Sequence, residues 1–442
     1  MADMASRMRS PGLKIFVIAL LTVLMAVPLL FVEFALSDRE GRAGEAQMDV
    51  AAGWGGIQTV AGPMLLLPYE ETVTTIVDGR AVQTPQRGIA VLLPTTLDLD
   101  ARSEMGERFR GIFPVPVYRA TTAIKASFDK QALDALVPQG AKPLWDQASV
   151  SMLVTDVRGL AGNVTMLVNG HEVSFQPGIG VEGSTAAGIH APLGLVEAPD
   201  GLSLSTDLPL RGSRELNFAS LGRQTTAHIV SNWRDPSFSG AFLPSSRKVG
   251  PEGFDATWNV PYLARGYGQS FATPENALNV VMSSAFGVKF YQPVDFYQLV
   301  QRSLKYAILF VGLAFLVFFV AELIVGKRLH AAQYALMGAA QVLFYLLLLS
   351  FAEHIGFLWA YIVAALATVT LTALYAASAF ASKARAAILA AVLGALYGLL
   401  YVILIQEDYA LLIGALVLFA ALGTTMFATR KIDWTRVAPE PV

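Results

Sequence analysis

Two short patterns in the sequence match motifs whose residues perform known chemistry. Gly178–Gly183 reads G-x-G-x-x-G, which binds a dinucleotide only where a strand turns into a helix that faces the pyrophosphate. Here Pro177 precedes the pattern and a Ser/Thr/Ala/Gly run follows it, so we interpret it as a turn-rich loop. His171-Glu172 begins like the zinc-protease motif H-E-x-x-H, but Phe175 stands where the second histidine ligand must be. This stretch predicts a strand with an ordinary histidine.

The sequence also gives little support for a catalytic serine or cysteine nucleophile. Ser127–Lys130 and Ser245–Lys248 both read S-x-x-K, but the S-D-N and K-T-G elements that this chemistry also needs are missing from the sequence. A G-x-S-x-G elbow and a P-loop are missing too, and the absence of cysteine excludes disulfides, thiolate metal sites and a cysteine nucleophile. We therefore predict a non-enzymatic protein with no catalytic residue, metal site or cofactor.

An acid inside an apolar segment is the strongest candidate for activity in a membrane. Glu322 is the only carboxylate within the five C-terminal apolar segments, and an intramembrane acid is a functional candidate by default. It lies five residues before Lys327, about 7–8 Å of helix rise from the interface. The cost of a charge there predicts a partner, and Lys327 or His330 on the same side could supply it. We name Glu322 and His330 as candidate functional residues.

A second candidate is the aromatic segment Ser231–Pro244. Trp233, Phe238 and Phe242 are large apolar residues separated by proline and glycine, which interrupt regular strand pairing. We expect a surface loop or strand end used for contact or positioning. The alternative is that the three aromatic residues attach the loop to the core of its domain.

The composition indicates that these residues belong to a membrane protein. The chain has 442 residues, 54% hydrophobic and 15% charged, whereas a soluble domain carries about 25% charged residues. The net charge of −2, with no basic cluster longer than two residues, argues against nucleic-acid binding. We predict membrane lipids, and not nucleic acid, as partners.

Six apolar segments are long enough to cross the roughly 30 Å hydrocarbon core: 15–34, 306–326, 329–351, 355–379, 386–405 and 409–428. The first is too long for a signal-peptide core and lacks a small-x-small cleavage pattern, which predicts an uncleaved anchor. Lys and Arg in short loops are retained in the cytoplasm, and they fall on one side: Arg7, Arg9, Lys14, Lys327, Arg328, Lys383, Arg385, Arg430, Lys431 and Arg436. The opposite short loops carry only Glu353-His354 and Glu407-Asp408.

These patterns predict a multi-pass protein of the bacterial inner membrane with a large periplasmic domain. Its predicted parts are a cytoplasmic N-terminus (1–14), an anchor helix (15–36), a periplasmic β-rich domain (37–305), a five-helix bundle (306–429) and a cytoplasmic tail (430–442). Short apolar runs broken by Gly and Pro predict strands at Met64–Pro68, Ile89–Pro94, Val150–Val154, Leu202–Ser205 and Thr225–Val230. We expect an antiparallel sandwich or a similar β-domain, one short helix at Asp129–Leu136, and a polar helical extension of the anchor over 37–52.

Small and polar residues recur on single faces of the predicted bundle helices: His330, Tyr334, Gly338, Gln341 and Tyr345; Tyr361, Thr368, Thr372 and Tyr375; Gly394, Tyr397, Gly398 and Tyr401. Such faces usually mediate helix packing. The alternative is a ligand or ion path.

Several stretches, in order along nearly the whole chain, are similar to the CreD family of bacterial inner-membrane proteins. They are Val60–Pro63, Asp156–Gly159, Gly188–Leu193, Ser231–Trp233, Pro236–Phe238, Gly240–Pro244, Lys305–Phe310, Arg328–His330, Gln333-Tyr334, Tyr345–Ser350, Glu353–Phe357 and Thr429–Trp434. The resemblance implies association with cell-envelope integrity, regulation by a two-component sensor system, and altered tolerance of colicins and β-lactams. It implies no catalytic residue and no cofactor.

We therefore expect a non-enzymatic protein that supports cell-envelope integrity or the envelope stress response. It would act through its periplasmic domain on envelope or other inner-membrane proteins. One alternative is a transporter or lipid-handling protein that uses the helix bundle. The other is an envelope hydrolase with a dispersed site.

Overall fold

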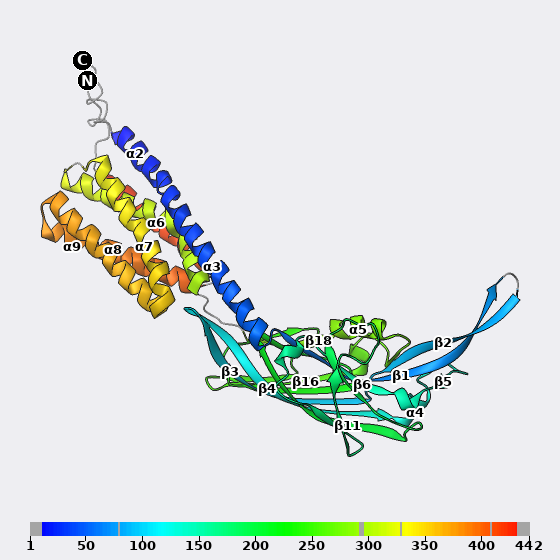
Figure 1. Cartoon of the computed structure of the whole chain (residues 1–442). Coiled ribbons are helices and arrows are strands. Elements are labelled where there is room, and N and C mark those ends of the chain that lie inside the picture. The colour runs from blue at the N-terminus through cyan, green and yellow to red at the C-terminus, as the bar shows by residue number, and fades with distance from the viewer. Residues whose placement is uncertain (1–10, 78–79, 291–295, 328, 407–408, 431–442) are drawn as a thin grey trace. The chain divides into compact units, whose positions relative to one another are not determined.

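The computed structural model describes residues 11–77, 80–290, 296–327, 329–406 and 409–430. The chain divides into two compact units. The helical unit comprises residues 1–43 and 294–442, and the β unit comprises residues 44–293. Figure 1 shows the elements of both units. The predicted basic residues Arg7, Arg9, Arg328, Lys431 and Arg436, and the acids Glu407 and Asp408, lie outside the described residues.

The helical unit contains the predicted membrane spans. Six described helical segments are long and apolar enough to cross a membrane, one near the N-terminus and five toward the C-terminus, which confirms the predicted fold class. Their helices are α2 (Pro11–Leu24), α3 (Ala26–Trp54), α6 (Phe296–Val325), α7 (Ala331–Ile355), α8 (Phe357–Phe380), α9 (Lys383–Ile405) and α10 (Ala410–Thr429). The first segment runs from Lys14 to Trp54, so the predicted polar extension over 37–52 is helical.

Close packing joins the N-terminal helices to the bundle. A Cβ on Gly338 of α7 would lie 2.7 Å from the Phe315 ring of α6 and 2.9 Å from the sulfur of Met25, which stands between α2 and α3. Glycine at this position therefore lets three helical segments approach one another, as small residues do in membrane helices. Within the bundle, α7 packs against α6 and α8, and α9 packs against α6 and α8.

The β unit is built from two sheets with one shared hydrophobic core. The first has the order β14-β18-β12-β1-β6-β10-β9, with β2 and β5 paired to β1 and β17 paired to β2. Its strands are β1 (Gln58–Val77), β2 (Arg80–Leu92), β5 (Lys142–Pro143), β6 (Ser149–Val154), β9 (Gln176–Pro177), β10 (Gly188–Pro192), β12 (Glu215–Ala219), β14 (Pro236–Gly240), β17 (Ser270–Phe271) and β18 (Ala285–Phe290).

The second sheet has the order β15-β16-β13-β3-β4-β11-β7-β8. Its strands are β3 (Thr96–Arg110), β4 (Phe113–Asp129), β7 (Thr165–Val168), β8 (His171–Ser174), β11 (Gly201–Ser213), β13 (Gln224–Ser231), β15 (Ser246–Gly250) and β16 (Gly253–Pro261). From Gly201 to Gly212, buried residues of β11 alternate with residues that are exposed or partly exposed, as expected for a sheet with one solvent-facing side.

The local predictions in this unit are largely correct. All five predicted strand segments overlap strands, the short helix is α4 (Lys130–Asp134), and His171 begins β8. The G-x-G-x-x-G pattern lies in the loop between β9 and β10 and does not open a helix. Three short 3-10 helices (Trp145–Gln147, Val157–Gly159 and Tyr262–Ala264) complete the unit.

Two features differ from the expectation. Helix α5 (Pro274–Ser283) was not predicted, although Pro274 stands at its first position, where proline is favourable. The β1–β12 and β3–β13 pairs are parallel. Parallel neighbours need a long crossover and leave no tight-turn signal in the sequence, so a purely antiparallel arrangement was the simpler expectation.

Candidate functional site

The intramembrane acid Glu322 is paired with the N-terminal helix. Its side chain, on α6, forms an ion pair with Lys14 of α2 and accepts a hydrogen bond from the Tyr334 hydroxyl of α7 at 3.0 Å. The Lys14 ammonium also donates to the carbonyl oxygen of Leu329 at 3.0 Å. Glu322 is only 5% exposed, so these contacts satisfy a buried carboxylate, as membrane interiors require.

The partners predicted for Glu322 are wrong. Lys327 is exposed and takes part in none of the ion pairs found among the described residues. His330 is the N-cap of α7: its Nδ1 accepts from the backbone N–H of Ala332 at 3.3 Å, and its own N–H donates to Gln333 at 2.8 Å. The histidine therefore caps a helix. The true partner, Lys14, is separated from Glu322 by most of the sequence.

A second acid forms a similar network on the same N-terminal segment. The Glu353 side chain on α7 is 7% exposed, lies 3.7 Å from the Arg39 Nε of α3 and accepts from the Tyr297 hydroxyl of α6 at 3.1 Å. Arg39 follows Lys14 by 25 residues, or about 37 Å of helix, which exceeds the roughly 30 Å hydrocarbon thickness. The two carboxylate networks therefore lie toward opposite ends of the spans, and each joins a base of the N-terminal segment to α6 and α7.

The polar faces predicted on the bundle helices point at one another. The Tyr397 hydroxyl of α9 contacts Oε1 of Gln341 on α7 at 2.5 Å, and the Tyr361 hydroxyl of α8 donates to the Tyr397 carbonyl oxygen at 2.6 Å. The ring of Phe344 packs against both tyrosines, with ring centroids 5.3 and 4.6 Å away. These contacts match the helix-packing interpretation. Within the part of the chain that the structure describes, no neighbouring atom lies within 4 Å of a Cβ built at Gly394 or Gly398, so those two glycines do not mediate close packing there.

The three aromatic candidates pack against the β core. The Phe238 ring of β14 lies edge-on to Phe254 and Trp258, with centroids 5.6 and 5.7 Å apart. The Phe242 ring lies 6.2 Å from Phe286. Trp233 is also partly buried against this core, and its indole N–H donates to the Asp235 carbonyl oxygen at 3.1 Å. This geometry matches the core-attachment alternative, and the contact role stays a prediction.

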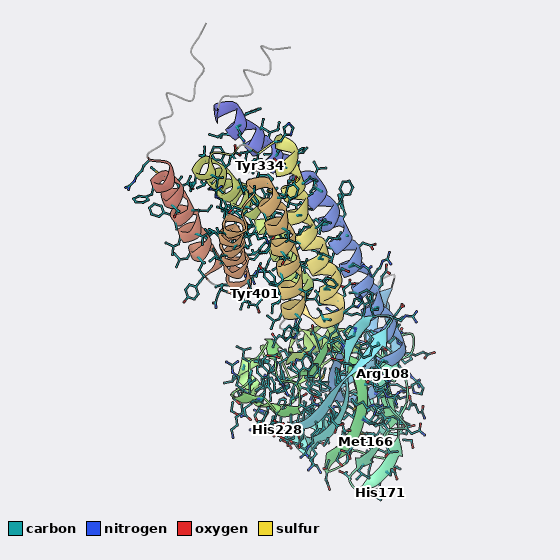
Figure 2. The ribbon with its side chains drawn as sticks, turned by 90° about the vertical axis from the view of Figure 1, so that its left-hand side faces the viewer. Arg108, Met166, His171, His228, Tyr334 and Tyr401 are labelled. Atoms are coloured by element: carbon teal, nitrogen blue, oxygen red, sulfur yellow. The ribbon has the colours of Figure 1, made fainter. Side chains whose placement is uncertain are left out.

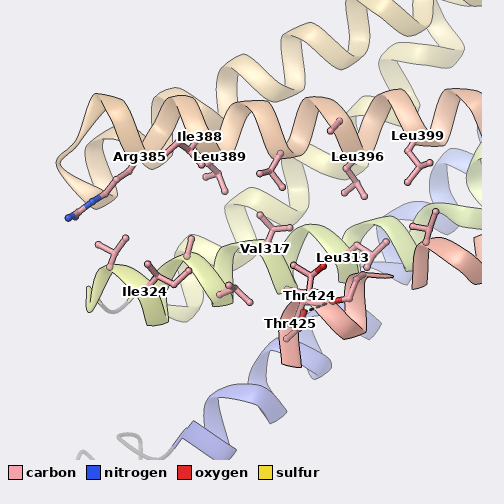
Figure 3. Close-up of a pocket in the computed structure, with 18 residues that line it drawn as sticks. Leu313, Val317, Ile324, Arg385, Ile388, Leu389, Leu396, Leu399, Thr424 and Thr425 are labelled. Carbon is pink, nitrogen blue, oxygen red and sulfur yellow. Dashed lines mark hydrogen bonds between the residues drawn. The ribbon is translucent and has the colours of Figure 1, made fainter. Parts of the chain in front are cut away.

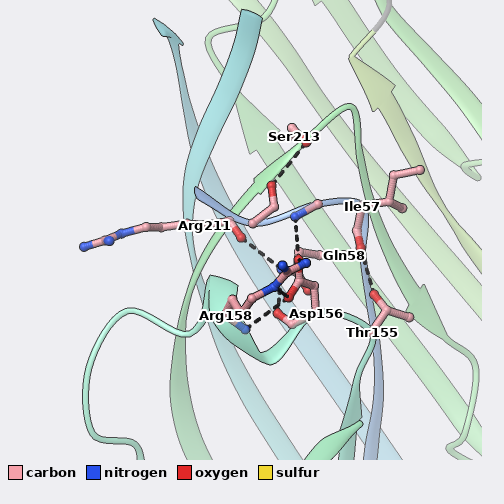
Figure 4. A network of polar contacts seen from close by, with 9 residues as sticks. Ile57, Gln58, Thr155, Asp156, Arg158, Arg211 and Ser213 are labelled. Atoms are coloured by element: carbon pink, nitrogen blue, oxygen red, sulfur yellow. Dashed lines mark hydrogen bonds and ion pairs between the residues drawn. The ribbon is translucent and has the colours of Figure 1, made fainter. Parts of the chain in front are cut away.

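The start of β1 is held by a polar network that the sequence analysis did not identify (Figure 4). Gln58 is fully buried, and its Nε2 donates to the carbonyl oxygens of Asp156 and Arg211 at 3.0 Å each. The Asp156 carboxylate accepts from the backbone of Gly56 at 2.9 Å and from the Arg158 guanidinium at 2.8 and 2.9 Å. The hydrogen bonds from Arg158 lower the pKa of Asp156, and the bond from Gly56 adds to this effect.

Two glycines make this network possible. Gly55 has φ +130°, and a Cβ there would lie 2.5 Å from the Arg211 carbonyl oxygen. A Cβ on Gly159 would lie 2.2 Å from Nε2 of Gln58. Side chains at either position would therefore collide with the network. Asp156–Gly159 is one of the stretches that carry the family resemblance, and that resemblance was the only sequence signal for this site.

The bundle also has an apolar groove of about 510 Å³ between α6, α9 and α10 (Figure 3). Its polar lining residues are Arg385, Thr424 and Thr425, and the remainder are aliphatic. Among the described residues, no group of three or more His, Asp or Glu side chains is placed to hold a metal ion.

Comparisons with known proteins agree with the resemblance seen in the sequence. The family model described as "Inner membrane protein CreD" matches residues 10–435. The chain is 33% identical over 421 residues to the Escherichia coli (strain K12) protein of that name, covering 93% of this chain and 91% of the relative.

Proposed function

This chain belongs to the CreD family of inner membrane proteins, and we propose from that premise that it supports cell-envelope integrity without catalysing a reaction. It acts through contacts of its β-rich domain with envelope components or other inner-membrane proteins. The domain faces the periplasm in this proposal, because the basic short-loop residues gather on the other side of the spans.

The observation that carries the proposal is a long two-stranded arm. Strands β1 and β2 pair continuously from Leu65 opposite Leu92 to Val77 opposite Arg80, and Figure 1 shows them extending beyond the other strands of the β unit. In the described part of the chain, other strands pair with β1 and β2 only near the base of the arm. Toward the tip, the outermost such pairs are Glu70 of β1 with β5 and Val91 of β2 with β17. Beyond these contacts, neither outer edge of the arm pairs with another strand among the described residues, so both edges carry backbone groups without a strand partner there.

Such an arm suits partner binding. An isolated hairpin contributes little to the stability of its domain, and its unpaired edges are templates for strand addition by another chain. Thr72 and Thr74 on β1, and Gln83 through Arg87 on β2, are exposed. Pro85 and the ion pair of Arg87 with Glu70, 2.8 Å between Nη2 and Oε1, fit the usual protection of edges against unselective pairing.

The test is to shorten the arm without disturbing the sheet. Glu71 lies directly opposite Gln86, so an Asn-Gly turn can replace residues 72–85 and close a two-residue hairpin. We expect the shortened protein to accumulate in the membrane and unfold at the parental temperature, but to fail to restore envelope tolerance in a strain that lacks its own copy. Full restoration by a normally abundant shortened protein would contradict the proposal.

The groove in the bundle favours lipid handling as a second candidate. An aliphatic surface with a cation, Arg385, among its lining residues fits a phospholipid whose acyl chain lies between α9 and α10 and whose phosphate meets the guanidinium. Leu396→Trp should fill the groove and reduce the lipid retained in native mass spectrometry. Leu412→Trp, on an exposed position of α10 that is not part of the groove lining, is the matched control. Equal lipid retention by both variants would remove this candidate.

A further inference from the structure

A tryptophan in the β unit is surrounded by three arginines. Trp54 is the last residue of α3, and its ring centroid lies 4.4 Å from the guanidinium carbon of Arg108, 5.3 Å from that of Arg119 and 5.0 Å from that of Arg211. We call these four residues the Trp54 cluster. The three arginines stand on β3, β4 and β11, which are consecutive neighbours in the second sheet. Arg108 lies at the opposite end of the β unit from His171 (Figure 2).

The cluster concentrates positive charge on one face of the sheet. Arg119 is paired directly with Arg211 across β4 and β11, so both side chains project from the same face, and all three arginines are exposed. Like charges directly opposite each other destabilise a sheet. One acid, Glu104, lies opposite Arg119 on β3. The nearby Asp49 instead pairs with Arg110 at 3.2 Å. Within the described residues, none of the three arginines takes part in an ion pair.

The tryptophan is held in place by its surroundings. Its indole N–H donates to the Tyr118 carbonyl oxygen at 3.3 Å, and the next residue, Gly55, allows the chain to pass against the Arg211 backbone. The Arg211 carbonyl oxygen is engaged by Gln58, whereas its side chain points away from that network (Figure 4). The backbone of this arginine is therefore fixed, while its guanidinium contacts the Trp54 ring and forms no hydrogen bond or ion pair with the described residues.

We propose that the Trp54 cluster binds the phosphate group of an anionic ligand. Each guanidinium offers a planar fork of donors that matches phosphate oxygens, and the three charges together favour a dianion over a single carboxylate. The Trp54 ring attracts the cations through its π face, and all three guanidinium carbons lie within 5.3 Å of its centroid. A bound phosphate would remove the repulsion between Arg119 and Arg211. The inference stands on this geometry alone and is independent of the envelope role.

Inorganic pyrophosphate, titrated calorimetrically into the full chain in phosphatidylcholine nanodiscs, tests the site. We expect saturable binding, weakened at least about tenfold by Arg211→Gln, a loss equivalent to roughly 1.4 kcal/mol, and unaffected by Arg223→Gln. Arg223 is a matched control, since it is an exposed arginine of the same unit whose guanidinium lies 5.3 Å from the ring of Tyr262. Equal affinity of both variants, or no saturable binding by the parent, would overturn the proposal.

A second measurement separates binding from a purely structural role. Arg211 faces only Arg119 across the paired strands, so without ligand Arg211→Gln should unfold at the parental temperature or above it. Pyrophosphate should then raise the unfolding temperature of the parent and not that of the variant. If the arginine only covers Trp54, the variant unfolds earlier and both proteins respond to pyrophosphate alike, which would overturn the proposal. If phosphatidylglycerol in the nanodiscs raises the unfolding temperature of the parent but not that of Arg211→Gln, a lipid phosphate is the ligand. If it raises neither, the ligand is a soluble phosphate.

Discussion

Replacing Lys14 should destabilise the protein more than replacing Glu322, its partner in the buried ion pair. Lys14→Met leaves a carboxylate that is 6% exposed and that, among the residues the structure describes, keeps the Tyr334 hydroxyl as its partner. Removing one member of a buried pair costs about 3–5 kcal/mol. Because the Lys14 side chain is 22% exposed, we expect about 2–3 kcal/mol here. Glu322→Gln still accepts from Tyr334 and leaves Lys14 bonded to the Leu329 carbonyl oxygen, so we expect about 1 kcal/mol.

The double variant provides the decisive comparison. Lys14→Met with Glu322→Gln leaves no buried charge, so its unfolding free energy should lie within about 1 kcal/mol of the parent. The coupling energy of the cycle would then be about 2–3 kcal/mol, within the range for residues in contact. The assay is reversible unfolding in mixed micelles with increasing dodecyl sulfate, alongside abundance in the membrane. Lys383→Met, an exposed lysine at the start of α9, is the control and should cost almost nothing.

Additive losses in the double variant would refute this reasoning, because they would show that the two side chains act separately. A different result would support a functional role for Glu322. The Glu322→Gln protein could accumulate and unfold like the parent but fail to restore envelope tolerance. In that case the carboxylate has a proton- or ion-coupled role that its packing does not explain.

Three further outcomes follow from the structure. Trp233→Ala should lower the free energy of unfolding by about 2 kcal/mol, since the ring is partly buried against the core. Val196→Ala, at a 96% exposed position, should leave that free energy unchanged. A stable Trp233→Ala protein without envelope function would instead favour the contact role. Asp156→Asn should cost about 2 kcal/mol at pH 7. Because Arg158 lowers the folded-state pKa of Asp156, the carboxylate stabilises the fold above its unfolded pKa, and the difference between parent and variant in urea unfolding should shrink as the pH falls below about 4. A cysteine at Asp200, where the side chain is 90% exposed, should react with an impermeant maleimide added to the periplasm, and reaction only from the cytoplasmic side would refute the predicted topology.

The sequence alone determined the membrane spans, because crossing a hydrocarbon layer depends on the length and apolarity of one continuous segment. It also determined most of the strand segments, since the turn residues and apolar runs that define them are local. The interpretations of Gly178–Gly183 as a loop and of His171 as a strand residue were correct for the same reason: each motif lacked its required local context.

The tertiary structure decided which of these segments meet. Glu322 needed a cationic partner by energetics, and the nearest bases in the sequence were Lys327 and His330, but the helix faces brought Lys14 to it instead. The Trp54 cluster likewise joins a helix end to three strands whose register sets Arg119 beside Arg211. Neither pairing leaves a periodic signal along the chain. Partners far apart in sequence are selected by the packing of whole elements, which only the folded chain specifies.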